Sequence, residues 1–250
     1  MKILVTGSRG FIGKNLVKIL QRTKNIGKIM EYNRENNLDE LNEFCKEADA
    51  VFHLAAVLRP ETLSGFDGNI RLTSDLLQIL EDNNNKCPVM FASSIQAELG
   101  NPYGNCKKIE ETKFIDYGNR NSVNTYIFRF PTLFGTMSRP NYTSVVSTFC
   151  YNTVVGLPIT INNPAAQIKF AFVEFVMNRV IKIVLENLPE LSNKILYSQK
   201  FYLVGLGELV YYMQTLKQNI APCIKRDDDF YEKLAFTYKW YNENHKIFQS

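Results

Sequence analysis

The sequence predicts an α/β protein in which a doubly wound parallel sheet is followed by a small C-terminal lobe. Short apolar segments alternate with amphipathic helical segments up to about residue 135, a pattern typical of parallel sheets covered by helices. A glycine-rich turn joins the first of these strands to the first helix. With 250 residues, of which 45% are apolar, the chain can bury a sizeable core. We therefore divide it into a core over 1–135 and a lobe over 136–250 that is interleaved with this core.

The chain opens with an apolar strand, residues 3–5, that enters a loop with three glycines and then a helix. In such a loop Gly7 permits the tight turn, Gly10 lets a pyrophosphate approach the backbone, and Gly13 lets the helix pack closely on the strand. The phosphates would lie at the helix N-terminus, which carries about half a positive charge. This arrangement predicts a Rossmann-type dinucleotide site, and the alternative is a glycine turn without a ligand. The expected cofactor contacts in the loop are Gly7, Arg9, Gly10, Phe11, Ile12 and Gly13.

The second strand, residues 28–32, ends where a dinucleotide-binding unit selects its cofactor. An acidic residue at this point would bind the ribose 2′-OH and repel a 2′-phosphate. Neutral Asn33 stands there instead, followed by Arg34 and with Arg9 close by in the glycine loop. Two guanidinium groups favour a phosphate, so the prediction is NADPH. Glu31 offers the alternative, since a carboxylate bound to the ribose would favour NAD.

The other elements follow from apolar spacing and capping signals. A capping box at residues 37–40 opens a short helix, which leaves little room for a strand before residue 50. The first half of the sheet is therefore expected to be one strand short. Further strands are expected at residues 50–56, 89–92, 126–131, 159–161, 169–172 and 200–204, and helices at residues 69–81, 101–114, 145–155, 173–185 and 206–216.

Composition narrows the class of protein. The five cysteines are odd in number and scattered, which indicates reduced thiols in a cytoplasmic protein, and with two histidines no metal site is expected. No apolar run approaches the ~18 residues that a membrane span needs, and the N-terminal run is too short for a signal peptide. The net charge of +4 is dispersed, which argues against nucleic-acid binding and suits small polyanions.

Three side chains point to proton transfer at a carbonyl group. Ser94 ends a strand, and Tyr103 and Lys107 lie four positions apart on the next helix, which places them on one face. The lysine ammonium would lower the pKa of the phenol from about 10, so that Tyr103 could give or take a proton. Ser94 would hold the same oxygen, and Lys107 would also reach the nicotinamide ribose. The alternative, a chance surface pair, is disfavoured by the glycine loop upstream.

These motifs resemble those of the extended short-chain dehydrogenase/reductases, which act mainly on nucleotide sugars. The segments that carry this resemblance are residues 6–13, 53–56, 93–94, 103–107 and 129–135. The chain is more similar still to the reductase domain of one branch, the CapF-type capsular polysaccharide enzymes, from residue 1 to about 240. The features of that branch are found at residues 59–61, 94–97, 101–104, 140–142 and 147–151.

The resemblance implies NADPH-dependent reduction of the C4 ketone of a UDP-linked 2-acetamido-2,6-dideoxy-4-keto-hexose for surface glycans. It also implies that Asn69 completes the Ser94, Tyr103 and Lys107 set and that the protein is a homodimer. CapF-type enzymes carry a metal-binding cupin domain for epimerisation, and we expect this chain, which ends at Ser250, to act without one. Further expected cofactor contacts are Leu54, Ala55, Ala56 and Phe130, and expected substrate contacts are Arg59, Ile95, Gln96, Thr132, Arg139 and Tyr142.

Within the family, the two residues after the serine distinguish reactions. Dehydratases place acidic residues there and epimerase/reductases a cysteine, whereas Ile95 and Gln96 cannot exchange protons. Hydride transfer alone is therefore expected. Thr132 replaces an asparagine that many relatives use to bind substrate, and His53 is expected to be a packed residue. The alternatives are a reductase of another keto sugar, such as a dTDP-rhamnose-type intermediate, one that also epimerises C3, or a non-catalytic NADP-binding regulatory subunit.

Overall fold

The computed structural model describes residues 1–249, which form two compact units. The first unit contains Met1–Phe130 and Met177–Ser198, and the second contains Pro131–Val176 and the described residues from Gln199 on. The division therefore falls a few residues before 135, and residues 177–198 return to the first unit. All five cysteines are free thiols. Among the described residues, no helix is both long and apolar enough to cross a membrane.

The first unit is built on a six-stranded sheet in which every pairing is parallel. Its strand order is β2-β1-β3-β4-β5-β8, which confirms the expected fold class. Because only a helix separates β2 from β3, β2 is the edge, and the first half of the sheet is one strand short as expected. The strands are β1 (Lys2–Thr6), β2 (Lys28–Tyr32), β3 (Ala50–His53), β4 (Val89–Ser94), β5 (Thr125–Phe130) and β8 (Lys194–Tyr197).

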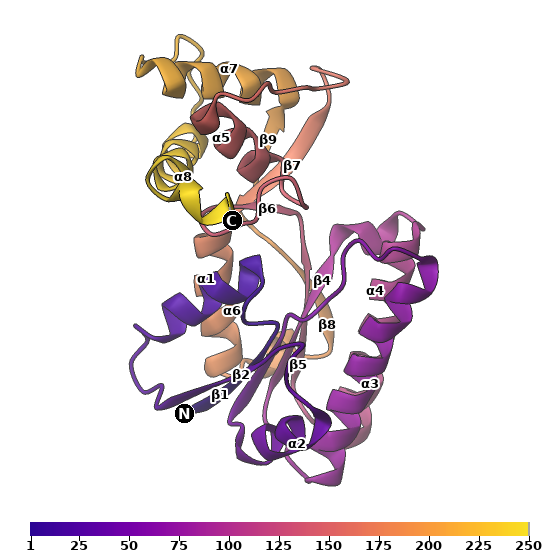
Figure 1. Cartoon of the computed structure of the whole chain (residues 1–250). Helices are drawn as coiled ribbons and strands as arrows, with labels where there is room; N and C mark the ends of the chain where they lie inside the picture. The colour runs from indigo at the N-terminus through magenta and orange to yellow at the C-terminus, as the bar shows by residue number, and fades with distance from the viewer. Residues whose placement is uncertain (250) are drawn as a thin grey trace. The chain divides into compact units, whose positions relative to one another are not determined.

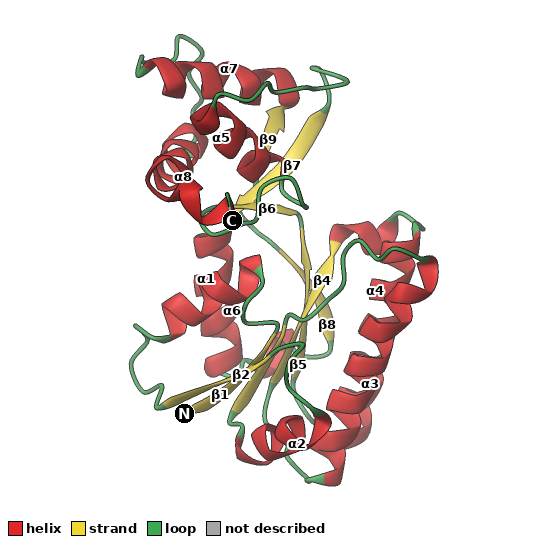
Figure 2. Cartoon of the chain, in the orientation of Figure 1, coloured by secondary structure: helices red, strands yellow, loops and turns green. Residues whose placement is uncertain are grey.

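Helices cover both faces of this sheet (Figure 1, Figure 2). On one face lie α2 (Leu38–Glu47), α3 (Asp67–Asp82) and α4 (Pro102–Asn121). On the other lie α1 (Phe11–Leu20) and the part of α6 (Val173–Leu185) that belongs to this unit. The capping box that opens α2 is confirmed, since Asn37 Oδ1 accepts from the Glu40 N–H at 2.9 Å and Glu40 Oε2 accepts from the Asn37 N–H at 2.9 Å.

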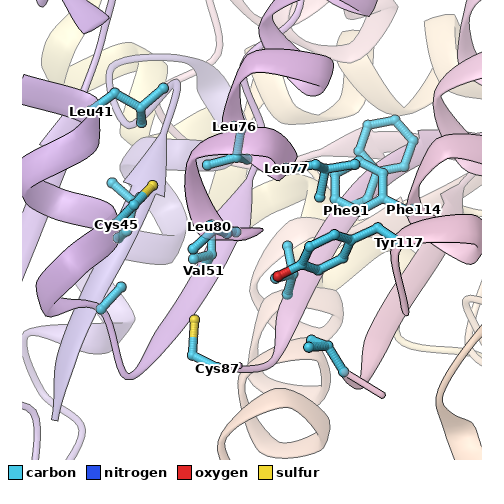
Figure 3. Close-up of a cluster of buried hydrophobic side chains, with 14 of the residues drawn as sticks. Leu41, Cys45, Val51, Leu76, Leu77, Leu80, Cys87, Phe91, Phe114 and Tyr117 are labelled. Carbon is cyan, nitrogen blue, oxygen red and sulfur yellow. The ribbon is translucent and has the colours of Figure 1, made fainter. Parts of the chain in front are cut away.

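One core of the first unit lies between the sheet and α2 to α4 (Figure 3). The rings of Phe91 in β4 and Phe114 in α4 stack with centroids 4.6 Å apart. Helix α4 continues past residue 114, where the sequence predicts its end, because Tyr117 is also buried and its hydroxyl donates to the carbonyl of Asn85 at 3.3 Å. This packing fixes the helix that carries Tyr103 and Lys107.

The second unit contains a three-stranded sheet in the order β6-β7-β9, with one parallel and one antiparallel pairing. Its core is aromatic and includes Phe134, Phe170, Tyr202 and Phe230. The expected strand at residues 159–161 is wrong, because Ile159 and Ile161 pack against this core without pairing in a sheet. The elements are β6 (Thr132–Phe134), α5 (Val145–Val155), β7 (Gln167–Phe172), β9 (Tyr202–Gly205), α7 (Leu206–Gln218) and α8 (Phe230–Asn244). Helix α8 is not among the helices that the sequence predicts.

Candidate active site

The glycine turn after β1 is closed so tightly that two of its positions require glycine. Gly7 has a φ of +70°, and a side chain there would lie 2.7 Å from the backbone nitrogen of Ala55. A side chain on Gly13 would lie 2.6 Å from the Cα of Ser8, so glycine lets α1 pack against the turn. Gly10 begins α1 without a side-chain cap, and the first turn of this helix contains no acidic residue. The backbone N–H groups at this end can therefore receive an anion.

The end of β2 is bound to the glycine turn through Asn33. The Asn33 Oδ1 accepts from the Arg9 N–H at 3.1 Å, and its Nδ2 donates to Ser8 Oγ at 2.8 Å. The Arg9 guanidinium forms an ion pair with Glu35, a carboxylate that sequence reasoning left out. Arg34 is exposed and has no ion-pair partner within residues 1–249. The two guanidinium groups are thus both present, and one of them is offset by a carboxylate.

The segment after β3 joins the same edge of the sheet. Thr6 Oγ1 accepts from the backbone N–H groups of Leu54 and Ala55 at 3.2 and 3.3 Å, which holds these residues beside Gly7. His53 is 1% exposed, and burial lowers the pKa of its imidazole to about 3. It is a neutral packed residue, in agreement with the sequence interpretation.

Ser94 and Tyr103 are joined by a short connection that glycine makes possible. Ser94 ends β4, and its Oγ accepts from the Gln96 N–H at 3.2 Å in the 3₁₀ turn η2 (Ile95–Glu98). Asn101 caps α4 by accepting from the Gly104 N–H at 2.8 Å. A side chain on Gly104 would lie 2.7 Å from the carbonyl carbon of Gln96 and closer still to its oxygen. The start of α4, with Tyr103, therefore packs directly on the turn that follows Ser94.

Lys107 lies under Tyr103 in a buried position. Its side chain is 1% exposed, and its Nζ lies 5.9 Å from the ring centroid of Tyr103 and 4.5 Å from that of Phe91. The same Nζ is 3.1 Å from Oε2 of Glu110, whose side chain is fully buried. Burial lowers the pKa of Lys107, but the carboxylate of Glu110 and the phenol of Tyr103 raise it by more, so the net shift is upward.

The pKa of Tyr103 departs from the expectation. Burial raises it, the ammonium of Lys107 lowers it, and the carboxylate of Glu110 raises it, with a net upward shift. The expected lowering by Lys107 is present, but burial and Glu110 outweigh it, and the sequence shows the lysine but neither the burial nor the neighbouring carboxylate. In this environment the phenol is protonated at neutral pH and is suited to donate a proton.

Comparison with known proteins identifies the family. The model of the NAD dependent epimerase/dehydratase family matches residues 3–190. The chain belongs to this family. Membership confirms the resemblance seen in the sequence motifs, and the family is one that binds nicotinamide dinucleotides.

Known proteins resemble this chain in sequence and in fold. The chain is 38% identical, over 84% of its length, to the UDP-2-acetamido-2,6-beta-L-arabino-hexul-4-ose reductase of Pseudomonas aeruginosa, of which it spans 56%. The crystal structure of the capsular polysaccharide assembling protein CapF from Staphylococcus aureus superposes with a TM-score of 0.85 at 34% identity, over 96% of this chain and 66% of that one. WbmF of Bordetella bronchiseptica, solved in complex with NAD+, has the same fold, with a TM-score of 0.80 at 20% identity, over 99% of this chain and 94% of WbmF. The chain thus spans less than two thirds of the first two proteins.

The residues at the glycine turn fit the dinucleotide of the epimerase/dehydratase family. The uncapped start of α1 offers N–H groups to a pyrophosphate, and Gly7 and Gly13 leave the turn free of side chains. Phe130 ends β5 directly beside Ser94 in the sheet register, at the same edge. No group of three or more potential metal ligands is found within the described part of the chain.

The remaining predicted residues are placed as follows. The side-chain amide of Asn69 binds both backbone groups of Val57, at 2.7 and 3.0 Å, and contacts Cys106 Sγ at 3.8 Å, so it holds the segment after β3 against α4. Arg59 is exposed in that segment, and Ile95 and Gln96 directly follow Ser94. In the second unit lie Thr132, in β6, and Arg139 and Tyr142, whose guanidinium carbon and ring centroid are 5.9 Å apart.

Sequence reasoning missed two adjacent carboxylates in α4. Glu110 binds Lys107, and Glu111 forms two hydrogen bonds with Arg129, at 2.8 and 2.6 Å, and accepts from Ser93 Oγ. The signal that could have found Glu110 is its spacing, since residues three apart on a helix are neighbours. For Glu111 no local signal exists, because Arg129 lies in a different element.

Proposed function

We propose that the protein reduces the C4 ketone of a UDP-linked 2-acetamido-2,6-dideoxy-4-keto-hexose with NADPH, in the synthesis of surface polysaccharide. The observation that carries this proposal is the position of Tyr103 beside the buried Lys107, whose Nζ lies 5.9 Å from the Tyr103 ring centroid, at the edge of the sheet that bears the glycine turn. The similarity to a reductase of a UDP-linked 2-acetamido-hexulose supports the substrate class.

Each side chain has a definite role in this reaction. Tyr103 donates its proton to the carbonyl oxygen, and the Ser94 hydroxyl donates a hydrogen bond to the same oxygen and orients it. Lys107 places a positive charge beside the phenol and stabilises the phenolate that remains. When bound, the reduced cofactor supplies the hydride that C4 accepts, so hydride and proton together convert the ketone to an alcohol.

Neither residue after Ser94 can act as a further acid or base. Ile95 is apolar and Gln96 carries an amide, so we propose reduction without elimination or epimerisation. We propose that the first unit holds the cofactor and that Arg59, Thr132, Arg139 and Tyr142 contribute contacts to the sugar nucleotide.

The choice of NADPH rests on the end of β2. Asn33 is neutral and already bound to the glycine turn, and Arg34 is exposed beside it, which favours a 2′-phosphate. Glu35 offsets Arg9 and reduces this preference.

We further propose a homodimer formed through α3 and α4, where Ile109 is 48% exposed. We also propose a cytoplasmic location, where free thiols and NADPH occur together.

The test is turnover of the UDP-linked 4-keto sugar with NADPH, measured as the loss of nicotinamide absorbance. Tyr103→Phe removes the donated proton, and kcat is expected to fall by a factor of about 10² to 10⁴. Tyr117→Phe, on the same helix, loses only a hydrogen bond to Asn85 and is expected to retain activity. Equal rates for Tyr103→Phe and the parent would remove the proposed role.

The same assay separates the alternative functions. In deuterated water, deuterium at C3 or C5 of the product would reveal an epimerase as well as a reductase. Faster turnover of a dTDP-linked keto sugar would identify another substrate class. Cofactor binding without turnover of any keto sugar would indicate a non-catalytic subunit.

A further inference from the structure

A continuous set of buried hydrogen bonds connects the glycine turn to Lys107. Thr6 Oγ1 lies 2.8 Å from His53 Nδ1, and His53 Nε2 lies 3.1 Å from Thr73 Oγ1. The Thr73 hydroxyl donates to Glu110 Oε1 at 2.8 Å, and Glu110 Oε2 lies 3.1 Å from Lys107 Nζ. All five side chains are buried, and none of these contacts is needed by the reaction steps assigned above.

The direction of each hydrogen bond follows from the inventory of donors. Thr73 has one hydroxyl proton and gives it to Glu110, so its oxygen accepts from His53 Nε2–H. The neutral imidazole then carries no proton on Nδ1, which accepts from the Thr6 hydroxyl. Every donor in the set therefore points toward Glu110, and the Cys106 thiol lies 3.6 Å from both Glu110 Oε2 and the Phe66 carbonyl oxygen. Both oxygens of Glu110 act as acceptors, as in a carboxylate.

The Glu110 carboxylate contacts the same Lys107 ammonium that lies beside the Tyr103 ring. The ammonium is held between Glu110 Oε2 and the face of the Phe91 ring, where it is stabilised as a cation. A carboxylate beside this ammonium partly cancels the positive charge that the phenol experiences. A fully buried charge pair is costly to maintain, and a structural role alone could be filled by apolar side chains of similar size.

We propose that Glu110 is a positioning residue that holds the Lys107 ammonium and keeps the Tyr103 phenol protonated, so that the site acts as a proton donor in ketone reduction over a wider range of pH. This inference rests on the proposed function. The overall equilibrium of the reaction is unaffected, and what Glu110 sets is the pH range in which each direction proceeds.

Few groups near Glu110 can change their charge and so obscure its effect on the Tyr103 titration. From α3 the group that faces Glu110 is the Thr73 hydroxyl, and from β3 it is the His53 imidazole, whose pKa of about 3 keeps it neutral. On α4 itself the Cys106 thiol has a pKa raised to about 11, by burial first and then by Glu110. Within the described part of the chain, Cys106 and Lys107 are therefore the groups beside Tyr103 that can titrate in alkaline solution.

The first experiment follows the phenol directly in the full-length protein. Tyrosine is labelled with carbon-13 at Cζ, and the Tyr103 signal is identified by its loss in Tyr103→Phe. As long as Lys107 remains an ammonium in Glu110→Gln, the Tyr103 titration is expected to move to lower pH by about one unit, because a negative charge is removed. Glu110→Asp keeps a more distant carboxylate and should titrate between the two. Asp116→Asn, an exposed carboxylate of the same helix, should titrate like the parent.

The second experiment measures reduction of the keto sugar and oxidation of its alcohol product against pH. For Glu110→Gln the alkaline limb of reduction should move down by the same amount as the titration. At a fixed pH below the pKa of Tyr103, the phenolate fraction that oxidation requires should rise about tenfold for each pH unit by which the Tyr103 titration moves down.

The outcomes are distinct. No downward movement of the Tyr103 titration in Glu110→Gln, including failure to reach it before alkaline unfolding, overturns the proposal. If Glu110→Gln does not fold, Glu110→Asp decides alone. A Tyr103 titration in Glu110→Asp at or above that of the parent would then overturn the proposal. The titration requires no turnover, so an inactive parent would refute the proposed function while the role of Glu110 would still be decided.

Discussion

Gly104 couples the fold to the chemistry, and replacing it with alanine tests that coupling. The added methyl group would lie 2.7 Å from the carbonyl carbon of Gln96, whereas ordinary carbon contacts need about 3.5 Å. The start of α4 must therefore move by about 0.8 Å or more from the turn after Ser94. Tyr103, the preceding residue, moves with it. A displacement near 1 Å at a reacting group can cost about 10² in rate, and kcat/KM of Gly104→Ala should fall by about that factor.

Stability should change much less than activity in this variant. Overpacking costs about 1 to 3 kcal/mol, while alanine in place of glycine in a helix gains about 1 kcal/mol. We expect the net loss in the free energy of unfolding to be at most about 2 kcal/mol in a urea titration. Gly68→Ala in α3, where an added methyl group meets nothing within 4 Å, should be slightly more stable and fully active. Parental kcat/KM in Gly104→Ala would refute the reasoning.

Three further predictions concern charge. Arg34→Glu should lower kcat/KM with NADPH at least about tenfold relative to NADH, and an unchanged ratio would assign the cofactor preference elsewhere. Glu111→Gln removes the buried carboxylate that binds Arg129 and leaves this guanidinium paired with the exposed Glu98, so it should cost about 2 kcal/mol in urea unfolding; a loss below about 1 kcal/mol would contradict it. Because the pKa of His53 is lowered to about 3, its contribution to stability is complete above about pH 6.5 and is lost as the pH falls toward 3. As the pH falls through this range, the free energy of unfolding of the parent should therefore decrease by about 1.4 kcal/mol per pH unit more than that of His53→Asn, as measured by urea unfolding at several pH values.

Local features of the sequence predict most of the first unit. The apolar strands, the glycine turn and the capping box of α2 depend on residues close together in the chain, and each is confirmed. The missing strand also follows from chain length, since residues 34–49 can hold only one element. Strand β8 was not predicted, because it is four residues long and partly exposed and is defined by its pairing with β5, more than sixty residues earlier.

The candidate site shows the same limit at the level of side chains. Spacing places Tyr103, Lys107 and Glu110 on neighbouring turns of one helix face, but a charged residue at that spacing is usually solvated. Only the tertiary structure shows that α3 and β4 cover this face, so that Thr73 and Phe91 exclude water from it. The direction of the Tyr103 shift therefore required the fold.

Adjacent carboxylates in α4 take different roles because they point to different elements. Glu111 reaches β5 and β4 through Arg129 and Ser93, so it holds the helix on the sheet and fixes where Tyr103 stands. Glu110 faces α3 and acts on Lys107, so it sets the charge that the phenol experiences. Loss of the first should therefore reduce stability and activity together, while loss of the second should move the pH profile. A variant of either residue that produced the other pattern would show that the two roles are assigned to the wrong side chains.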